Sequence, residues 1–199
     1  MDQPKKSLLI IFYRNPEPGK VKTRLAATLG NEKALEVFVK LSLHIRDITQ
    51  NLDVDKMVFY SDILQKGDIW TDSQYFKALQ HGDDLGIRME SAFAEGFNAG
   101  YSSICIIGTD CFELTKEVVA RGVESLQSVD AVIGPARDGG YYLLGMNKLH
   151  REVFRNKQWS TETVFRNTIA DFDFLGLKYI ALPVLSDVDI EEDLPPELR

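Results

Sequence analysis

Short apolar runs recur along the chain, and turn-forming or charged residues bound each of them. This pattern is typical of strands that are buried on both faces of a sheet. The runs cover residues 8–12, 57–60, 104–107, 131–133, 141–144 and 179–182. We therefore expect a strand at each of these positions.

Between the runs, apolar residues recur at intervals of three or four, as on the buried side of a helix. The first such stripe comprises Leu35, Phe38, Leu41, Ile45, Ile48 and Leu52, and predicts a helix of about five turns. The second comprises Leu85, Met89, Phe93 and Phe97.

Two further helices are predicted from candidate N-caps, because Ser and Thr side chains accept hydrogen bonds from the first amides of a helix. Thr115 precedes Val118, Val119 and Leu126, and Ser160 precedes Val164 and Ile169.

Alternation of strands and helices predicts right-handed crossovers and a mostly parallel, Rossmann-like α/β sheet with helices on both faces. Residues 131–133 and 141–144 lie too close in sequence for a helical crossover, so we expect one antiparallel strand there. The chain has 199 residues, 44% of them hydrophobic, which suits one core. We expect a single domain over residues 1–199.

The formal net charge of −7 disfavours a nucleic acid or an anionic membrane as the partner. No apolar stretch reaches the roughly 18 residues of a membrane span, and the first one lacks a cleavage site, so we expect a cytoplasmic protein. The two cysteines, Cys105 and Cys111, lack a metal or disulfide spacing and are expected to be buried thiols. Any bound anion must therefore be held by a local basic patch.

Such a patch follows the first predicted strand, and ligands of open parallel sheets bind at the carboxyl ends of the strands. Within residues 14–24, one acid, Glu17, accompanies four cations: Arg14, Lys20, Lys22 and Arg24. Gly19 permits close approach of the backbone to a ligand, so this segment is predicted to bind phosphate. A solvated basic loop is the alternative. The spacing is not that of a Walker A loop.

Carboxylates follow two other predicted strands. Asp110 comes directly after residues 104–107, and Asp187 and Asp189 follow the last strand. Mg²⁺ prefers oxygen ligands, and close carboxylates with no cation between them repel, so these residues are candidate ligands of one divalent ion. The alternative for Asp110 is the cap of a turn or helix.

The segment Asp138-Gly139-Gly140-Tyr141 joins two predicted strands. The glycines allow a tight reversal or close contact with a ligand, and Asp138 is placed to form hydrogen bonds. A substrate role for Tyr141 or Tyr142 is open, because one of the two is expected in the core.

Taken together, these segments resemble the bacterial DUF2064 family of GT-A-fold, nucleotide-diphospho-sugar-transferase-like proteins. The motifs are 16–25 (PEPGKVKTRL), 82–89 (GDDLGIRM), 108–111 (GTDC), 134–142 (GPARDGGYY), 159–161 (WST) and 187–194 (DVDIEEDL). Two residues depart from the family pattern: Phe112 stands where a proline is usual, and Arg137 where an acid is common. We expect the first to alter only a turn and the second to change which group of the substrate is recognised.

The resemblance implies a GT-A fold with Lys22 and Arg24 near the nucleotide phosphates. It also implies a Mg²⁺ or Mn²⁺ ion at Asp110 with Asp187 or Asp189, and substrate contacts from Arg88. Related enzymes include guanylyltransferases and glycosyltransferases, so the partners are a nucleotide and a small-molecule acceptor.

The cation density of the first loop favours nucleotidyl transfer from a nucleoside triphosphate to a phosphorylated or carboxylate acceptor, because pyrophosphate leaves with developing charge. Glycosyl transfer from a nucleotide-diphospho-sugar is the first alternative, and a non-catalytic nucleotide-binding module is the second. No Ser-His-Asp or Cys-His arrangement is present. The base, the acceptor and the oligomeric state, including a homodimer, stay open.

Overall fold

The computed structural model describes residues 6–199, which form one seven-stranded sheet covered by helices. The strands are β1 (Ser7–Tyr13), β2 (Asp55–Tyr60), β3 (Phe76–Leu79), β4 (Ser103–Ile107), β5 (Ala131–Pro135), β6 (Tyr141–Met146) and β7 (Tyr179–Ala181). The α-helices are α1 (Thr23–Leu29), α2 (Asn31–Thr49), α3 (Leu85–Asn98), α4 (Lys116–Ser125) and α5 (Val164–Phe174). Three short 3₁₀ turns are η1 (Arg151–Phe154), η2 (Glu191–Asp193) and η3 (Pro196–Leu198).

The strand order is β3-β2-β1-β4-β6-β5-β7. All neighbouring strands are parallel except at β6, which runs antiparallel to both β4 and β5. The expected single antiparallel strand is thereby confirmed, as is the mostly parallel sheet. Strand order reverses between β1 and β4, and at such a point the loops that leave adjacent strands diverge and open a crevice.

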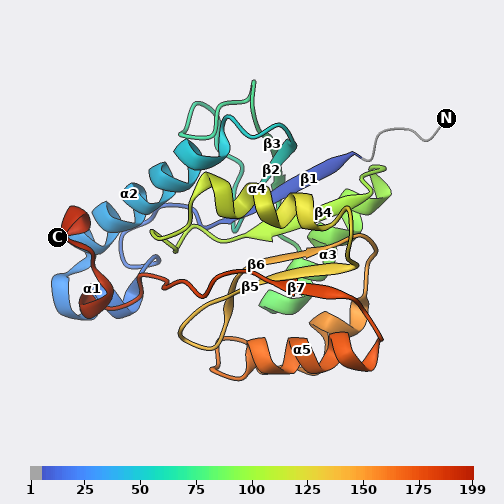
Figure 1. Ribbon diagram of the computed structural model, residues 1–199. Coiled ribbons are helices and arrows are strands. Elements are labelled where there is room, and N and C mark those ends of the chain that lie inside the picture. Colours follow the sequence, from blue (N-terminus) through green and yellow to red (C-terminus); the bar gives the residue numbers. More distant parts are fainter. Residues whose placement is uncertain (1–5) are drawn as a thin grey trace.

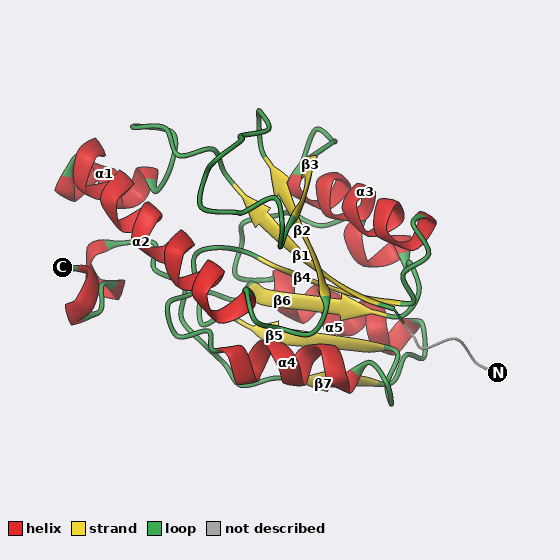
Figure 2. Cartoon of the chain, turned by 90° about the horizontal axis from the view of Figure 1, so that it is seen from above, coloured by secondary structure: helices red, strands yellow, loops and turns green. Residues whose placement is uncertain are grey.

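Helices cover both faces of the sheet (Figures 1 and 2). On one face, α2 and α4 pack through residues such as Phe38 and Val119 against alternate strand residues such as Leu9 and Ile107. On the other face, α3 and α5 do the same through Phe93 and Phe172. Because successive strand residues point to opposite faces, an unbroken apolar run fills both cores.

A smaller apolar cluster joins α1, α2 and the end of the chain, which lie side by side in Figure 1. Leu25, Leu41, Leu194 and Leu198 are buried in it. This cluster holds the last segment of the chain against α1 and α2, close to the segment that follows β1.

Two sequence expectations need correction. Strand β3 lies at the edge of the sheet and was not expected, because its four residues include an exposed Phe76 and form no apolar run. Ser160 does not cap α5, which begins at Val164 after Thr163. The intervening residues form a turn, with Ser160 at φ +61°, that packs against the β5–β6 connection. None of the helices in residues 6–199 is long and apolar enough to cross a membrane.

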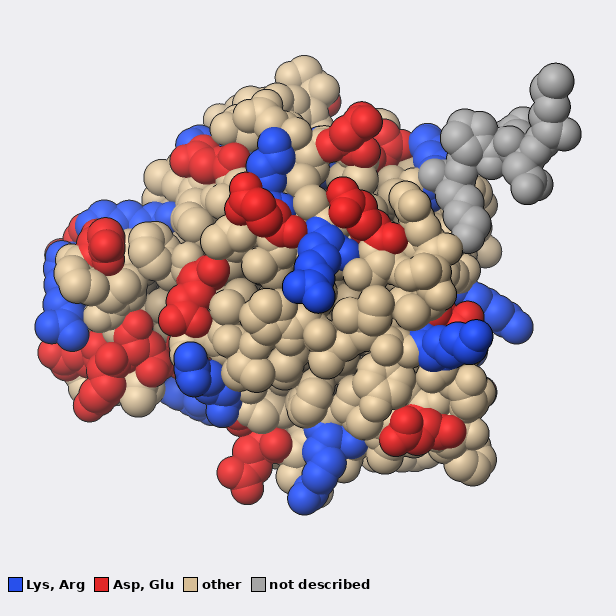
Figure 3. Space-filling view, in the orientation of Figure 1, with Lys and Arg blue, Asp and Glu red and all other residues tan. Residues whose placement is uncertain are grey.

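Acidic and basic side chains are mixed on the face shown in Figure 3, and no continuous basic surface covers that face. On this face, any site for a phosphate must therefore rest on a local group of cations.

Candidate active site

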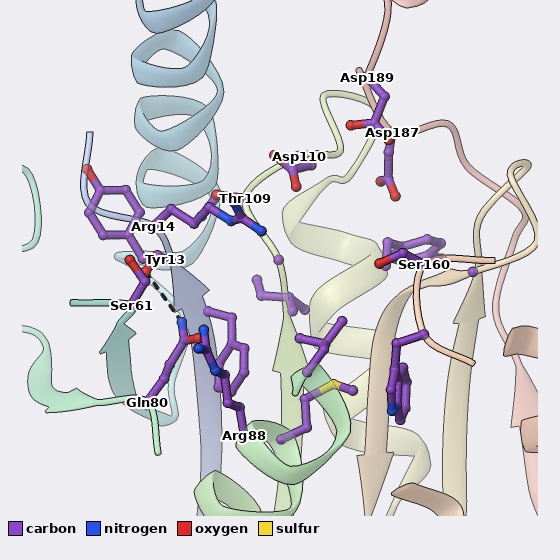
Figure 4. A pocket seen from close by; sticks show the side chains of 18 of the residues that line it. Tyr13, Arg14, Ser61, Gln80, Arg88, Thr109, Asp110, Ser160, Asp187 and Asp189 are labelled. Atoms are coloured by element: carbon purple, nitrogen blue, oxygen red, sulfur yellow. Dashed lines mark hydrogen bonds between the residues drawn. The ribbon is translucent and has the colours of Figure 1, made fainter. Parts of the chain in front are cut away.

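A cavity of about 810 Å³ opens at the carboxyl ends of β1 and β4, where the strand order reverses. Its size lies near the upper end of the roughly 300–1,000 Å³ typical of small-molecule sites. Residues from all four predicted segments line it (Figure 4). The members of the predicted site that do so are Arg14, Lys20, Lys22, Arg24, Arg88, Asp110, Asp138, Gly140, Tyr141, Asp187 and Asp189.

The basic segment after β1 contributes four cations to the cavity wall. Arg14, Lys20 and Lys22 precede α1, but Arg24 lies in its first turn rather than on a loop as expected. Lys22 adopts a left-handed conformation, with φ +46° and ψ +47°, where the chain enters the helix. Gly19 has φ +77° and lies outside the lining, so its visible role is to shape the turn.

Lys22 lies between two of the predicted metal ligands. Its Nζ is 2.6 Å from Asp110 Oδ1 and 3.2 Å from Asp189 Oδ1, and its side chain is 4% exposed. Burial alone would lower the pKa of Lys22, but the charges of Asp110 and Asp189 outweigh it and hold the pKa above its ordinary value. The ammonium therefore stays charged and screens the two carboxylates from each other.

Hydrogen bonds fasten the segment after β7 to the segment after β4. Val188 N donates to Asp110 O at 2.9 Å, and Ser186 N donates to the carboxylate of Glu113 at 2.8 Å. The buried thiol of Cys111 donates to Ser186 O at 3.4 Å. These bonds place Asp187 and Asp189 beside Asp110, although almost 80 residues separate them in sequence.

Asp187 is the carboxylate with the most perturbed titration. Burial, together with the negative charges of Asp110 and Asp138, raises its pKa from 3.8 to about 7. Lys22 offsets this only in part. A cation beside Asp187 would thus relieve an unfavourable charge arrangement.

The chemistry of these side chains fits a hard divalent cation, although Asp110, Asp187 and Asp189 do not form one closed cluster. Within residues 6–199, no group of three or more His, Cys, Asp or Glu side chains is close enough to enclose a metal ion. Asp189 has two cationic neighbours, Lys22 and, at 4.0 Å, Arg24 Nη1, whereas Asp110 forms an ion pair with Lys22 alone among the described side chains. Asp110 and Asp187 remain as the pair whose mutual repulsion a cation would relieve.

The β5–β6 connection has a structural function besides its place in the cavity. Gly139 has φ +88°, and a Cβ there would lie 2.1 Å from Glu162 O, so only glycine fits beneath the turn before α5. Gly139 does not line the cavity, whereas Asp138 and Gly140 do. The Asp138 carboxylate accepts a hydrogen bond from Gly140 N at 2.8 Å.

On the opposite side, side chains that the sequence analysis missed face Arg14 and Arg88 (Figure 4). Gln80 Nε2 donates to Phe59 O at 2.9 Å, which fixes its amide, and Ser61 lies next to it in the cavity. Both follow strand ends, β3 and β2. Ser61 comes directly after the predicted strand at residues 57–60 and was within reach of the strand-end rule, whereas Gln80 could be found only if β3 were recognised.

The buried Asn15 holds this side together. Its Oδ1 accepts hydrogen bonds from Asp62 N at 3.0 Å and Ile63 N at 3.2 Å. The loop after β2 is thus tied to the loop after β1. Trp159 and Thr161 also line the cavity and had been noted only as part of a family motif.

The two departures from the family pattern lie outside the cavity lining. Phe112 packs on the ring of His44, with centroids 4.8 Å apart. Arg137 is exposed, and its backbone N donates to Leu185 O. The expectation that Arg137 alters substrate reading is therefore not supported by its position.

Comparison with known proteins gives a family and a fold. The sequence matches the family described as "Uncharacterized protein conserved in bacteria (DUF2064)" over residues 44–161. No curated protein matches the chain. A crystal structure described as a "putative nucleotide-diphospho-sugar transferase from Desulfovibrio desulfuricans G20" is 34% identical, with a TM-score of 0.85; the match covers 92% of this chain and 82% of that one.

More distant structures share the architecture. One is a 4-diphosphocytidyl-2C-methyl-D-erythritol synthase from Anaerococcus prevotii DSM 20548, 11% identical, with a TM-score of 0.59 and coverage of 95% and 92%. Another is a CMP:2-keto-3-deoxy-manno-octonic acid synthetase in complex with CTP, 8% identical, with a TM-score of 0.55 and coverage of 94% for both chains. At these identities the likeness concerns the fold alone. By sequence and by structure, the chain belongs to the DUF2064 family and has the fold of nucleotide-diphospho-sugar transferases.

Proposed function

We propose that the protein is a Mg²⁺-dependent nucleotidyltransferase that joins the nucleoside monophosphate part of a triphosphate to a small acceptor. The observation that carries this proposal is the meeting of Lys22 with Asp110 and Asp189 at the mouth of one cavity. A cluster of cations for phosphate and a set of carboxylates for metal thus share one site.

The four cations of the segment after β1 are suited to the β and γ phosphates. Arg14, Lys20 and Arg24 are solvent-accessible, so a charge-assisted contact with phosphate replaces water rather than a strong internal partner. Lys22 is the exception, because it is buried between two carboxylates. Binding of a triphosphate would give its ammonium a second set of anions.

In the proposed reaction, an acceptor oxygen forms a bond to the α-phosphorus, and the bond from that phosphorus to the bridging oxygen breaks. The electron pair passes to pyrophosphate, whose charge the cations stabilise. Asp110 and Asp187 would hold Mg²⁺, which when bound supplies Lewis-acid stabilisation of phosphate oxygens. Positioning and electrostatics suffice, so no nucleophilic side chain is required.

Glycosyl transfer is the second candidate. It is supported by the 34% identical structure, which is described as a nucleotide-diphospho-sugar transferase. In that reaction the same cations would stabilise a nucleoside diphosphate leaving group. A non-catalytic nucleotide-binding module is a third reading. It predicts nucleotide binding that does not depend on a divalent ion.

The three candidate functions can be distinguished by measuring the melting temperature of the protein with each ligand. A ligand that binds the folded chain raises the melting temperature. Nucleoside triphosphates and nucleotide-diphospho-sugars are compared with Mg²⁺ and with EDTA. Our proposal predicts a larger Mg²⁺-dependent shift with a triphosphate, and pyrophosphate release once an acceptor is present. A shift only with nucleotide-diphospho-sugars would favour glycosyl transfer, and shifts that are independent of Mg²⁺ would favour the binding module.

A further inference from the structure

The basic residues that line the cavity all come from the first half of the chain. Every lysine or arginine of the lining lies in residues 14–24 or is Arg88, with Asp62, Asp83 and Asp84 also in the lining, and none comes from residues 111–199. Figure 4 shows Arg14 and Arg88 on one side, together with Gln80 and Ser61. The same figure shows Ser160 on the other side. We name as the second wall Ser160 and the lining residues near it in the β5–β6 connection and the turn before α5, which are Asp138, Tyr141, Trp159 and Thr161.

The apolar part of the second wall rests on α3. The indole of Trp159 packs on Gly86, where an added Cβ would lie 2.3 Å from Nε1. The hydroxyl of Tyr141 is 3.7 Å from Met89 Sδ. Trp159 and Tyr141 are each partly buried, and both line the cavity. Rigid aromatic surfaces of this kind suit the apolar face of a ring-shaped ligand.

The polar part of the second wall accepts hydrogen bonds and carries negative charge. Asp138 is exposed and has no ion-pair partner among the described side chains. Its Oδ1 accepts from Gly140 N, which leaves Oδ2 available. Asp187 also lines the cavity. An anionic group placed here would be repelled, whereas a hydroxyl would donate to a carboxylate.

We propose that the second wall binds the acceptor, and that the acceptor is an uncharged, ring-shaped and polyhydroxylated molecule such as a sugar or a cyclic polyol. This inference rests on the proposed nucleotidyl transfer and replaces the phosphorylated or carboxylate acceptor that the sequence suggested. One hydroxyl oxygen of the ring bonds to the α-phosphorus, its proton passes to water, and pyrophosphate leaves. The cations of the other wall remain committed to the nucleotide.

Tryptophan fluorescence tests this directly. Trp70 is fully buried, so a response that is present in the natural chain and absent in Trp159→Phe reports on the second wall. The probes are matched pairs: glucose with glucose 6-phosphate, ribose with ribose 5-phosphate, and myo-inositol with its 1-phosphate. Mg²⁺ and a triphosphate with a non-cleavable α,β-methylene bridge are kept at saturation.

We expect at least one uncharged member to change the Trp159 signal, with a Kd at least tenfold lower than that of its phosphorylated partner. Asp138→Asn retains an acceptor for Gly140 N but removes the charge, so it should narrow this tenfold preference. Arg137→Gln is the matched control, since Arg137 adjoins Asp138 but lies outside the lining; it should leave the preference unchanged.

Equal or tighter binding of the phosphorylated members, or no Trp159-dependent binding of any sugar or polyol, would overturn the inference. The melting shift with triphosphate and Mg²⁺ is measured on the same samples. If that shift is present and the sugars fail, only the acceptor class is wrong. If that shift is absent, the proposed function fails as well.

Discussion

The ammonium nitrogen of Lys22 lies 2.6 Å from a carboxylate oxygen of Asp110, so a group expected to bind phosphate is paired with a group expected to bind metal. In this arrangement, the ammonium and a divalent cation compete for Asp110. Phosphate attracts the ammonium, so binding of a triphosphate would weaken that competition. Nucleotide and metal should therefore bind cooperatively, as the following predictions specify.

Replacing Lys22 by Met should strengthen the binding of Mg²⁺ in the absence of nucleotide. The variant loses its competitor for Asp110, and a tenfold gain in affinity corresponds to about 1.4 kcal/mol. For a chain of this size, that raises the Mg²⁺-induced melting shift at saturation by about 3–6 °C. Lys20→Met, on the same loop but paired with Glu17, is the control. A shift equal to that of the natural chain would show that Lys22 and the metal do not compete.

Replacing Arg24 by Ala should weaken triphosphate binding while changing the melting temperature little. The side chain is 69% exposed, and its nearest carboxylate, Asp189, is 4.0 Å away, so it contributes little to stability. A charge-assisted contact with phosphate is worth about 1.5–3 kcal/mol. Calorimetric titration measures the loss, with the exposed Arg121→Ala as control. Equal affinities for the triphosphate in the Arg24 variant and the natural chain would support the alternative interpretation, in which the segment is a solvated basic loop.

Replacing Asp110 by Asn should reduce turnover by orders of magnitude and abolish the Mg²⁺-dependent part of nucleotide stabilisation. The ligand-free variant should also lose about 1 kcal/mol of stability, because the buried Lys22 keeps only Asp189 as a partner. Asp53→Asn, exposed at the start of β2, is the control. If Mg²⁺ raised the nucleotide-induced melting shift of the variant as much as that of the natural chain, Asp110 would not be a metal ligand.

Asp187 should make the free energy of unfolding depend on pH in EDTA. Its pKa is about 7 in the folded chain against an ordinary 3.8, so the folded state binds the extra proton between these values. Stability from this group is therefore present at about pH 4 and is lost as pH rises to about 7. Asp187→Asn should flatten this slope and add on the order of 1–2 kcal/mol above pH 7. Denaturant unfolding of both proteins at several pH values checks this, and identical slopes would contradict it.

Replacing Gly139 by Ala should destabilise the chain by about 1–3 kcal/mol or more, because the Cβ meets Glu162 O and φ is left-handed. The turn that carries Trp159 and Thr161 should move, so acceptor binding should fall more than nucleotide binding. Gly108→Ala is the control, since a Cβ there meets nothing within 4 Å and φ is not positive. Equal melting temperatures in the two variants would show that the turn adapts freely.

Much of the fold follows from the sequence, because buried parallel strands leave unbroken apolar runs. The elements that could not be predicted from the sequence depend on contacts between residues that are far apart in the chain. Residues 76–79 are a strand because β2 offers them an open edge, not because of their own pattern. The turn at Ser160 is set by packing on Gly139, so a good capping residue does not begin the helix.

The site is predictable to the same extent. Strand-end reasoning identified the residues that surround the cavity, because the topology fixes where strands end. It could not show that Lys22 lies between Asp110 and Asp189, since that pairing depends on hydrogen bonds such as that from Val188 to Asp110. The uneven distribution of basic side chains around the cavity likewise appears only when the loops are assembled.

The hydrogen bonds between residues 186–188 and residues 110–113 also have a consequence for the order of folding. Every described strand of the sheet ends by Ala181, so the strands all precede Asp187 and Asp189 in the chain. These two carboxylates reach Asp110 only when the last segment docks on residues 110–113. We therefore expect the acidic part of the cavity to be the last part of the molecule to form.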